Sequence, residues 1–317
     1  MREIADLGGS RDFYWGILSR DEQRKINLEI KNGTLTFLQL KSQKFTTGRF
    51  DYALDVRRSE AIRVLKDDKG KKVLEIGCGY GGITETLAEK FGNVDALDAC
   101  FELLEFTQLR LESAGISNVN LKFVPIFEEY FQRNLEGNYD LIVINGVLEW
   151  IGSGTSQSSP YSHQSNFLKK CESLLSKDGE IFLAIENRWY PKWWVRDPHS
   201  KLPMTAILPR KFANRISKSK LNEEYRTWIY SRFGIYNLFY KSNLSVFQEL
   251  YVLMTYRSPK WISDRSAFRR RRNRELIEIP SVFWNSMIKN GILRRLVFPL
   301  ILPSFVFILK SKSGSRR

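Results

Sequence analysis

The fold is decided by the stretch Val73-Leu74-Glu75-Ile76-Gly77-Cys78-Gly79-Tyr80-Gly81-Gly82. Its first four residues predict a short buried strand, and the glycines allow the backbone to turn tightly and to approach a ligand closely. Ile83, Leu87 and Phe91 then repeat at four-residue spacing, which predicts a helix. A glycine-rich turn that joins a strand directly to a helix is typical of nucleotide-binding sites, although Gly-x-Gly-x-x-Gly alone is weakly specific.

Short apolar runs and amphipathic segments continue to alternate beyond this turn. Further strands are expected at 94–97, 119–124, 141–144 and 180–185, with helices between them. This alternation predicts an α/β fold with a doubly wound, mostly parallel sheet that helices cover on both faces. Ser231–Asn243 is expected to be a helix, and Leu244–Leu253 and Pro303–Leu309 are expected to be two later strands.

Two carboxylates distinguish between the possible ligands of the glycine turn. Glu75 stands two residues before the first glycine, where a pyrophosphate gains nothing from it but an ammonium group does. Asp98 ends the second strand, and a carboxylate there can accept both hydroxyls of a ribose. A cofactor with a ribose, a sulfonium and an amino-acid tail fits both acids, and S-adenosylmethionine is such a cofactor.

These residues resemble the class I S-adenosylmethionine-dependent methyltransferases. Val73–Gly81 resembles their first motif, Asp98 their ribose-binding acid, and Tyr139–Trp150 their fourth strand with the loop that faces the methyl group. The resemblance implies a seven-stranded sheet whose last strand, Pro303–Leu309, runs antiparallel. It also implies a set of cofactor-binding residues: Glu75, Gly77, Cys78, Gly79, Tyr80, Gly81, Asp98, Ala99, Phe127 and Asn145.

One feature of the family pattern is missing. Family members often place an Asp after the third strand to bind the adenine amino group, but this chain reads Val124-Pro125-Ile126-Phe127-Glu128 there. We therefore expect backbone groups, together with Phe127 or Phe101, to hold the adenine. Both rings are equally suited to a place in the core.

The second half of the chain is similar to methyltransferases encoded with bacterial and archaeal surface-polysaccharide enzymes. Four segments carry this similarity: Ala184–Arg188, Asp197–Ser200, Leu208–Asn214 and Tyr225–Ser231. It implies O-methylation of a sugar or glycan intermediate.

A sugar hydroxyl is a poor nucleophile until its proton begins to leave, so a base helps. His199 is the first candidate base, with Asp197 able to orient it, and Glu149 is the second. Glu186, Asn187 and Arg188 are candidates for hydrogen bonds to sugar hydroxyls. Each of these residues also has an ordinary structural interpretation, as a loop histidine or a strand end.

The formal net charge is +15, from 50 basic and 35 acidic residues. Fifteen of the bases and only three acids lie from Arg257 onward, so the excess is concentrated near the C-terminus. Three interpretations of this region remain open: a solvated charged surface, contact with an anionic membrane through Phe283 and Trp284, or nucleic-acid binding.

Two functions therefore compete with glycan methylation. One is RNA methylation, although the loop Asn145–Leu148 lacks the Asn-Pro-Pro-Tyr type of signature, and the other is a non-catalytic cofactor-binding module.

The remaining composition limits the architecture. Three cysteines and two histidines are too few for a disulfide scaffold or an imidazole-based zinc site, so no metal is expected. No apolar run reaches the roughly 20 residues of a spanning helix, and we expect a cytoplasmic protein with peripheral contact at the inner face of the membrane. The expected division begins with an appendage at 1–53, which has a hairpin around Asn32-Gly33, and a cofactor-binding core at 54–256 with substrate loops at 187–230. A basic insertion at 257–302 and the last strand with a disordered tail at 303–317 follow.

Overall fold

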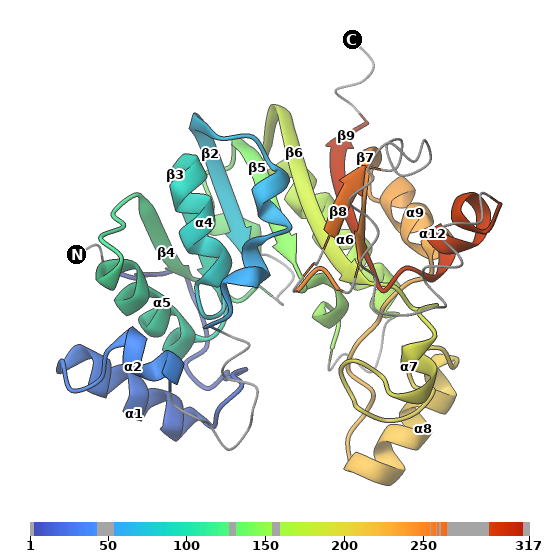
Figure 1. The fold of residues 1–317 in the computed structure, drawn as a ribbon, viewed down its shortest axis with the longest axis horizontal. Coiled ribbons are helices and arrows are strands. Elements are labelled where there is room, and N and C mark those ends of the chain that lie inside the picture. The colour runs from blue at the N-terminus through green and yellow to red at the C-terminus, as the bar shows by residue number, and fades with distance from the viewer. Residues whose placement is uncertain are drawn as a thin grey trace. The chain divides into compact units, whose positions relative to one another are not determined.

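The structure is a computed structural model that describes residues 3–42, 54–126, 131–153, 159–253, 255–257, 259, 261–264 and 292–312. The chain divides into two compact units (Figure 1). Unit 1 comprises Met1–Ile144 and Leu174–Gly179, and unit 2 comprises Asn145–Ser173 and Glu180–Arg317. Phe283 and Trp284, the residues of the possible membrane contact, lie outside the described residues.

Unit 1 is a parallel sheet with its helices in the expected places. Its strands follow the spatial order β1-β4-β3-β2-β5, and all neighbouring pairs are parallel. The strands are β1 (Ala5–Asp6), β2 (Asp68–Ile76), β3 (Phe91–Asp98), β4 (Val119–Phe123) and β5 (Tyr139–Asn145). Helix α4 (Gly82–Lys90) joins β2 to β3, and α5 (Phe101–Ser113) joins β3 to β4; a 3-10 turn, η3 (Phe131–Asn134), precedes β5. The predicted strand–turn–helix at Val73–Gly82 is confirmed.

The hairpin predicted around Asn32-Gly33 is wrong. The chain forms helix α1 (Arg20–Lys31) instead, followed by α2 (Phe37–Ser42). Ser19 and Glu22 form a capping box at the start of α1, and Gly33, with φ +73°, ends it. The Asn-Gly pair therefore closes a helix, because a residue with positive φ is needed at a helix end as well as in a hairpin turn.

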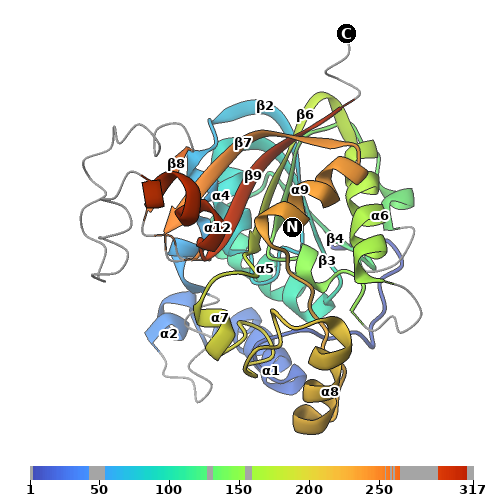
Figure 2. The same cartoon turned by 90° about the vertical axis from the view of Figure 1, so that its right-hand side faces the viewer.

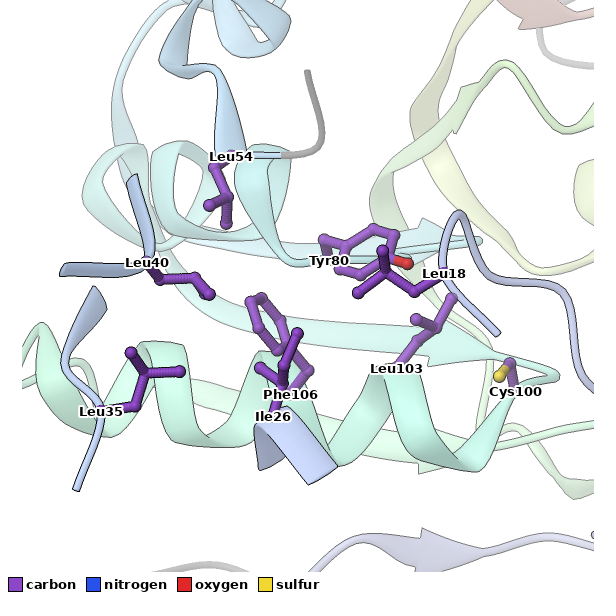
Figure 3. Packing of buried hydrophobic residues seen from close by; sticks show 9 residues of the cluster. All are labelled: Leu18, Ile26, Leu35, Leu40, Leu54, Tyr80, Cys100, Leu103 and Phe106. Carbon is purple, nitrogen blue, oxygen red and sulfur yellow. The ribbon is translucent and has the colours of Figure 1, made fainter. Parts of the chain in front are cut away.

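The N-terminal helices share a buried core with α5. Figure 3 shows Ile26, Leu35 and Leu40 around Phe106, with Tyr80 beside them. The Phe106 ring packs edge-on against Tyr80 at 5.4 Å and against Phe37 at 5.4 Å. Between Leu54 and Leu65 the chain forms two 3-10 turns, η1 (Val56–Ser59) and η2 (Ile62–Val64), and the Asp55 side chain caps the first.

Unit 2 is antiparallel. Its strands follow the order β6-β9-β7-β8, and Figure 2 shows β9 running between β6 and β7. The strands are β6 (Leu175–Glu186), β7 (Leu244–Leu253), β8 (Trp261–Asp264) and β9 (Ser304–Ser311). The helical elements are η4 (Leu148–Trp150), α6 (Pro160–Ser173), α7 (Lys192–Val195), α8 (Arg210–Leu221), α9 (Arg232–Lys241), a π-helical turn η6 (Leu293–Val297) and α12 (Phe298–Ile301).

The predicted α/β fold class is therefore confirmed, including the antiparallel last strand. The strand number differs from the expected seven, because the described residues contain nine strands. The two additional strands are β1, which pairs with β4, and β8, which pairs with β7. Both are short and lie at the end of the strand order in their own unit.

Candidate active site

The glycine turn in unit 1 is a tight, left-handed backbone loop. Gly77, Gly79 and Gly81 have φ values of +77°, +54° and +74°, which other residues rarely adopt. The amides of Gly77 and Cys78 both donate to the Leu97 carbonyl, at 2.8 and 2.9 Å, and fix the turn to the end of β3. A Cβ on Gly81 would lie 2.8 Å from the Thr107 side chain, whereas one on Gly79 would meet no atom within 4 Å. The space beside Gly79 is therefore open to a ligand.

Asp98 lies at the end of β3 and is almost fully buried. Its two carboxylate oxygens accept hydrogen bonds from the amides of Gly79 and Cys100, both at 2.8 Å. Burial raises the pKa of Asp98 to about 6, although the backbone donors lower it. Each oxygen has lone pairs left over, so the carboxylate fits the predicted ribose-binding role.

Glu75 connects the strand before the turn to the helix after it. Its Oε2 accepts a hydrogen bond from the Thr84 hydroxyl at 2.6 Å, and its side chain is buried. Burial raises the pKa of Glu75 to about 7, and the nearby Asp98 acts in the same direction. Of the two roles open to this acid, the structure favours orienting the turn over direct contact with the cofactor.

The other predicted cofactor residues differ in their surroundings. Cys78 and Ala99 are buried beside the turn, and Tyr80 accepts a hydrogen bond from the Ile17 amide at 2.9 Å, so its side chain serves the N-terminal packing. Phe127 lies outside the described residues. The alternative ring, Phe101, is covered on one face by the Arg11 guanidinium at 3.4 Å.

Asn145 ends β5, and both polar atoms of its side-chain amide are buried without a hydrogen-bond partner. A buried amide that is not hydrogen-bonded costs free energy unless a ligand or water satisfies it. This orphaned amide, the open space beside Gly79 and the buried acid at Asp98 are each consistent with a bound S-adenosylmethionine.

Unit 2 contains a second cluster, which joins the two predicted catalytic residues. Glu149 in η4, Glu186 at the end of β6 and His199 in the following loop have side chains that are at most 4% exposed. The His199 Nε2 lies 3.7 Å from Glu149 Oε1 and 3.6 Å from Glu186 Oε2. The Trp150 ring packs edge-on against the imidazole at 5.0 Å. Candidates that are 50 residues apart in the sequence thus form one polar site.

Sequence reasoning missed two members of this cluster, Tyr256 and Arg257. Arg257 donates to Glu186 Oε1 at 2.6 Å and lies 3.4 Å from His199 Nε2. The Tyr256 hydroxyl lies 3.4 Å from Glu149 and 3.3 Å from Glu186. Their position just after the end of β7 was the signal that could have identified them. Arg257 was instead assigned to the basic insertion.

The pKa values of the two buried carboxyls, Glu149 and Glu186, are shifted in opposite directions. Burial raises the pKa of Glu149, and the neighbouring Glu186 raises it further. Burial is the largest influence on Glu186 and would raise its pKa, but Arg257, His199 and hydrogen bonds to the carboxylate act together against burial and hold the pKa of Glu186 below its ordinary value. Glu186 is therefore the anion of the pair and Glu149 the carboxyl that holds a proton more readily. Three atoms, Glu149 Oε2, Glu186 Oε2 and His199 Nδ1, have no hydrogen-bond partner.

Three neighbouring residues, Asp197, Asn187 and Arg188, are hydrogen-bonded to the backbone in this structure. Asp197 lies 4.0 Å from His199 Nδ1 and instead accepts from the His199 and Ser200 amides at 2.7 and 2.8 Å, so it shapes the loop rather than orienting the ring. Asn187 donates to the Leu300 and Leu302 carbonyls. Arg188 donates to the Ile207 and Leu208 carbonyls. Of the three predicted sugar contacts, Glu186 alone keeps an unpartnered polar atom.

The same cluster is the place where a metal ion could bind within the described residues. Glu149, Glu186 and His199 each bring one ligand atom within 4.8 Å of the others. In this structure, however, the cation next to these carboxylates is the Arg257 guanidinium, 2.6 Å from Glu186 and 3.9 Å from Glu149.

Comparison with known proteins identifies the family. The family model described as "Methyltransferase domain" matches residues 67–230, just over half of the chain, and the chain belongs to this family. S-adenosylmethionine is the cofactor, and the protein is an S-adenosylmethionine-dependent methyltransferase, as the glycine turn and Asp98 indicated.

Individual relatives are similar over shorter stretches. The ubiquinone biosynthesis O-methyltransferase of Erwinia tasmaniensis is 30% identical over 124 residues, which are 39% of this chain and 46% of that protein. The malonyl-[acyl-carrier protein] O-methyltransferase of a Paenibacillus species is 28% identical over 155 residues, 45% of this chain and 55% of the relative. The chain thus spans about half the length of these curated relatives. Among solved structures, PKMT2 from Rickettsia typhi is 18% identical with a TM-score of 0.47, over 83% of this chain and 54% of that one.

Proposed function

We propose that this methyltransferase O-methylates a hydroxyl group of a sugar or glycan intermediate. The observation that carries the proposal is the buried His199, which lies between Glu149 and Glu186. A neutral amine can attack a methyl donor without help, but a sugar hydroxyl benefits from a base that takes its proton. A buried imidazole next to an anionic carboxylate is suited to that task.

In the proposed reaction the acceptor hydroxyl donates its hydrogen bond to His199, which would take the proton as the new carbon–oxygen bond forms and the bond between the methyl carbon and the donor sulfur breaks, leaving a neutral thioether. The resulting imidazolium is stabilised by the Glu186 carboxylate, 3.6 Å from Nε2. S-adenosylmethionine, when bound, supplies an electrophilic methyl group on its sulfonium sulfur. The chain's own contribution is to position the hydroxyl and to accept its proton.

The polar character of the cluster favours an acceptor with several hydroxyl groups. Glu149 Oε2 and Glu186 Oε2 are buried and unpartnered, and each can accept from a neighbouring hydroxyl of the same sugar. A carboxylate acceptor would be repelled by Glu186. The malonyl-type acceptor in the name of the Paenibacillus relative is therefore the less suitable model for this chain.

A phenolic hydroxyl is the second candidate acceptor. It is supported by the name of the Erwinia relative, a ubiquinone biosynthesis O-methyltransferase, and by Trp150, which offers an aromatic side chain beside His199. A phenol ionises far more readily than a sugar hydroxyl, so it depends less on a base. The dependence of turnover on His199 thus separates the two acceptors.

The test is incubation with labelled S-adenosylmethionine and cell extract, followed by separation into lipid-linked glycan, free sugar, phenolic lipid and RNA fractions. We expect label in a glycan or sugar fraction and a loss of 10²–10⁴-fold in turnover for His199→Gln. Affinity for the cofactor should not change in that variant. Label in the RNA fraction, or none in any fraction, would instead favour the RNA methyltransferase or the non-catalytic module.

The need for a metal is tested in the same assay. Because Arg257 supplies the positive charge at Glu186, we expect turnover to survive treatment with EDTA. Loss of turnover with EDTA, restored by Mn²⁺ or Zn²⁺, would show that a metal ion replaces the guanidinium.

A further inference from the structure

Unit 2 presents a group of exposed apolar side chains in the segment that follows β6. Trp194 and Val195 in α7, Met204 in the next loop, and Phe212 and Leu221 in α8 are each at least 40% exposed. Both Figure 1 and Figure 2 place α7 and α8 at the same end of unit 2. We call this region, residues 189–221, the α7–α8 surface. Several large apolar side chains exposed within one segment make that segment a candidate interaction site.

The α7–α8 surface is held in place by its own hydrogen bonds. The Met204 amide donates to the Trp194 carbonyl at 3.1 Å, which places this loop beside α7. Arg188 donates to the Ile207 and Leu208 carbonyls, just before α8. The Tyr225 hydroxyl donates to the buried Asp197 at 2.8 Å. The exposure of the apolar side chains is therefore fixed by a bonded framework.

The charge of the α7–α8 surface is strongly positive. Between Trp189 and Leu221 the chain has eight lysines and arginines but a single acid, Asp197, which is fully buried. Helix α8 contains no acid and buries Ala213 and Ser217. Its exposed bases, such as Lys211 and Arg215, flank Phe212. A helix with exposed bases beside an exposed aromatic ring has the pattern of an interfacial amphipathic helix.

We propose that the α7–α8 surface binds an anionic lipid bilayer, with Trp194, Val195 and Phe212 entering the interface and the surrounding bases facing the headgroups. Exposed bases beside aromatic rings would also suit nucleic acid, but Val195, Met204 and Leu221 are aliphatic and offer no ring for bases to stack on. No helix within the described part of the chain has the length and apolar character of a membrane span. The contact is thus a peripheral one, and it is carried by α7 and α8 rather than by the basic insertion at 257–302.

The experiment is flotation of the full chain with vesicles of phosphatidylcholine mixed with phosphatidylglycerol, and with vesicles of phosphatidylcholine alone. We expect binding to the anionic vesicles only, weakened by salt. The double variant Trp194→Ser/Val195→Ser and the single variant Phe212→Ser should each reduce binding by about tenfold or more, because they remove the inserted apolar groups. The charge reversal Lys211→Glu/Arg215→Glu should do the same.

Leu38→Ser is the matched control, because Leu38 is 81% exposed but lies in α2 of unit 1. This variant should float like the parent, and all variants should keep the parent's affinity for S-adenosylmethionine, which reports on folding. Three results would overturn the proposal. They are no binding by the parent, equal binding by the α7–α8 variants, and loss of binding only when Arg269–Arg272 are changed to serine.

Discussion

The glycine turn in unit 1 and the Glu149–His199 cluster in unit 2 are built in opposite ways. Residues 73–98 form the turn, and backbone amides supply its defining contacts, including both hydrogen bonds to Asp98. The cluster is assembled from four segments spread over more than a hundred residues, and side chains supply its contacts. The turn is nearly complete as it stands, whereas the cluster keeps three unpartnered buried atoms. Under the proposed function, a common cofactor would be bound mainly by backbone geometry, and a particular acceptor by side chains that leave hydrogen bonds open.

The largest effect is expected from breaking the turn. Asp98→Ala should weaken S-adenosylmethionine binding by about 100-fold or more, because two charge-assisted hydrogen bonds to the ribose, at about 1.5–3 kcal/mol each, are lost. Gly79→Arg should do the same by filling the open space beside the glycine. Titration calorimetry measures both. Asp178→Ala, at an exposed position in β6, is the control, and unchanged affinity in both turn variants would refute the assignment of the cofactor to this turn.

A smaller effect is expected from the two carboxyls of the cluster, and it should be unequal. Glu186→Gln should lower kcat by about tenfold or more, since it removes the anion that stabilises a protonated His199 and that pairs with Arg257. Glu149→Gln should change kcat by less than about threefold, because glutamine resembles a protonated carboxyl. Steady-state kinetics on the labelled acceptor fraction compares them. A larger loss in Glu149→Gln would make Glu149 the base and would reverse the assignment.

The glycine turn and the Glu149–His199 cluster should make the free energy of unfolding change with pH in opposite directions. The pKa of Glu75 is raised to about 7 and that of Asp98 to about 6, so the folded protein is most stable when both acids are protonated. The free energy of unfolding that they contribute is full below about pH 4 and is lost as the pH rises towards 7. Glu186, whose pKa is lowered, has the opposite slope.

Denaturant titrations between pH 4 and pH 8 test this difference. Glu75→Gln should remove about 3 kcal/mol of the fall in stability with rising pH, while its hydrogen bond from Thr84 is kept. Glu186→Gln should leave the slope above about pH 5 unchanged and should remove an opposing contribution only below that pH, because the pKa of Glu186 is lowered. An unchanged pH slope in Glu75→Gln would show that folding does not raise the pKa of this acid.

The smallest effect is expected from alanine substitutions at two glycines that have nearly the same φ angle. Gly146 in unit 2 and Gly33 in unit 1 have φ values of +74° and +73°, but a Cβ on Gly146 would lie 2.4 Å from the Tyr256 hydroxyl and one on Gly33 would meet nothing. Alanine at either position should cost about 1–2 kcal/mol of stability from left-handed strain. Only Gly146→Ala should also lower kcat, by a few-fold, because it displaces Tyr256. Equal kcat values for the two variants would remove Tyr256 from the active site.

Most of the sheet could be predicted because its signals are local. Each parallel strand except β1 contains a short apolar run, and each run predicted between 73 and 185 corresponds to an observed strand. The hairpin at Asn32-Gly33 failed for a physical reason: a positive φ serves a helix end as well as a turn, and the capping box at Ser19 and Glu22 decided in favour of the helix. The hydrogen bonds of Asn187 and Arg188 to backbone carbonyls could not be predicted either, since a polar side chain at a strand end can bond to the protein as well as to a substrate.

The sequence by itself determined the fold class and the cofactor, because a glycine-rich turn and the acids on either side of it are set by the backbone over a short stretch. The tertiary structure decided that Glu149, Glu186 and His199 share one buried site with Tyr256 and Arg257. No spacing in the sequence encodes that meeting, since it depends on where β6, β7 and the loop after β6 end in space. The sequence gives the net charge of +15 but not the role of each base. Only the tertiary structure shows which bases lie beside exposed apolar side chains on α7 and α8. It also shows that Arg257 is bound to the Glu186 carboxylate.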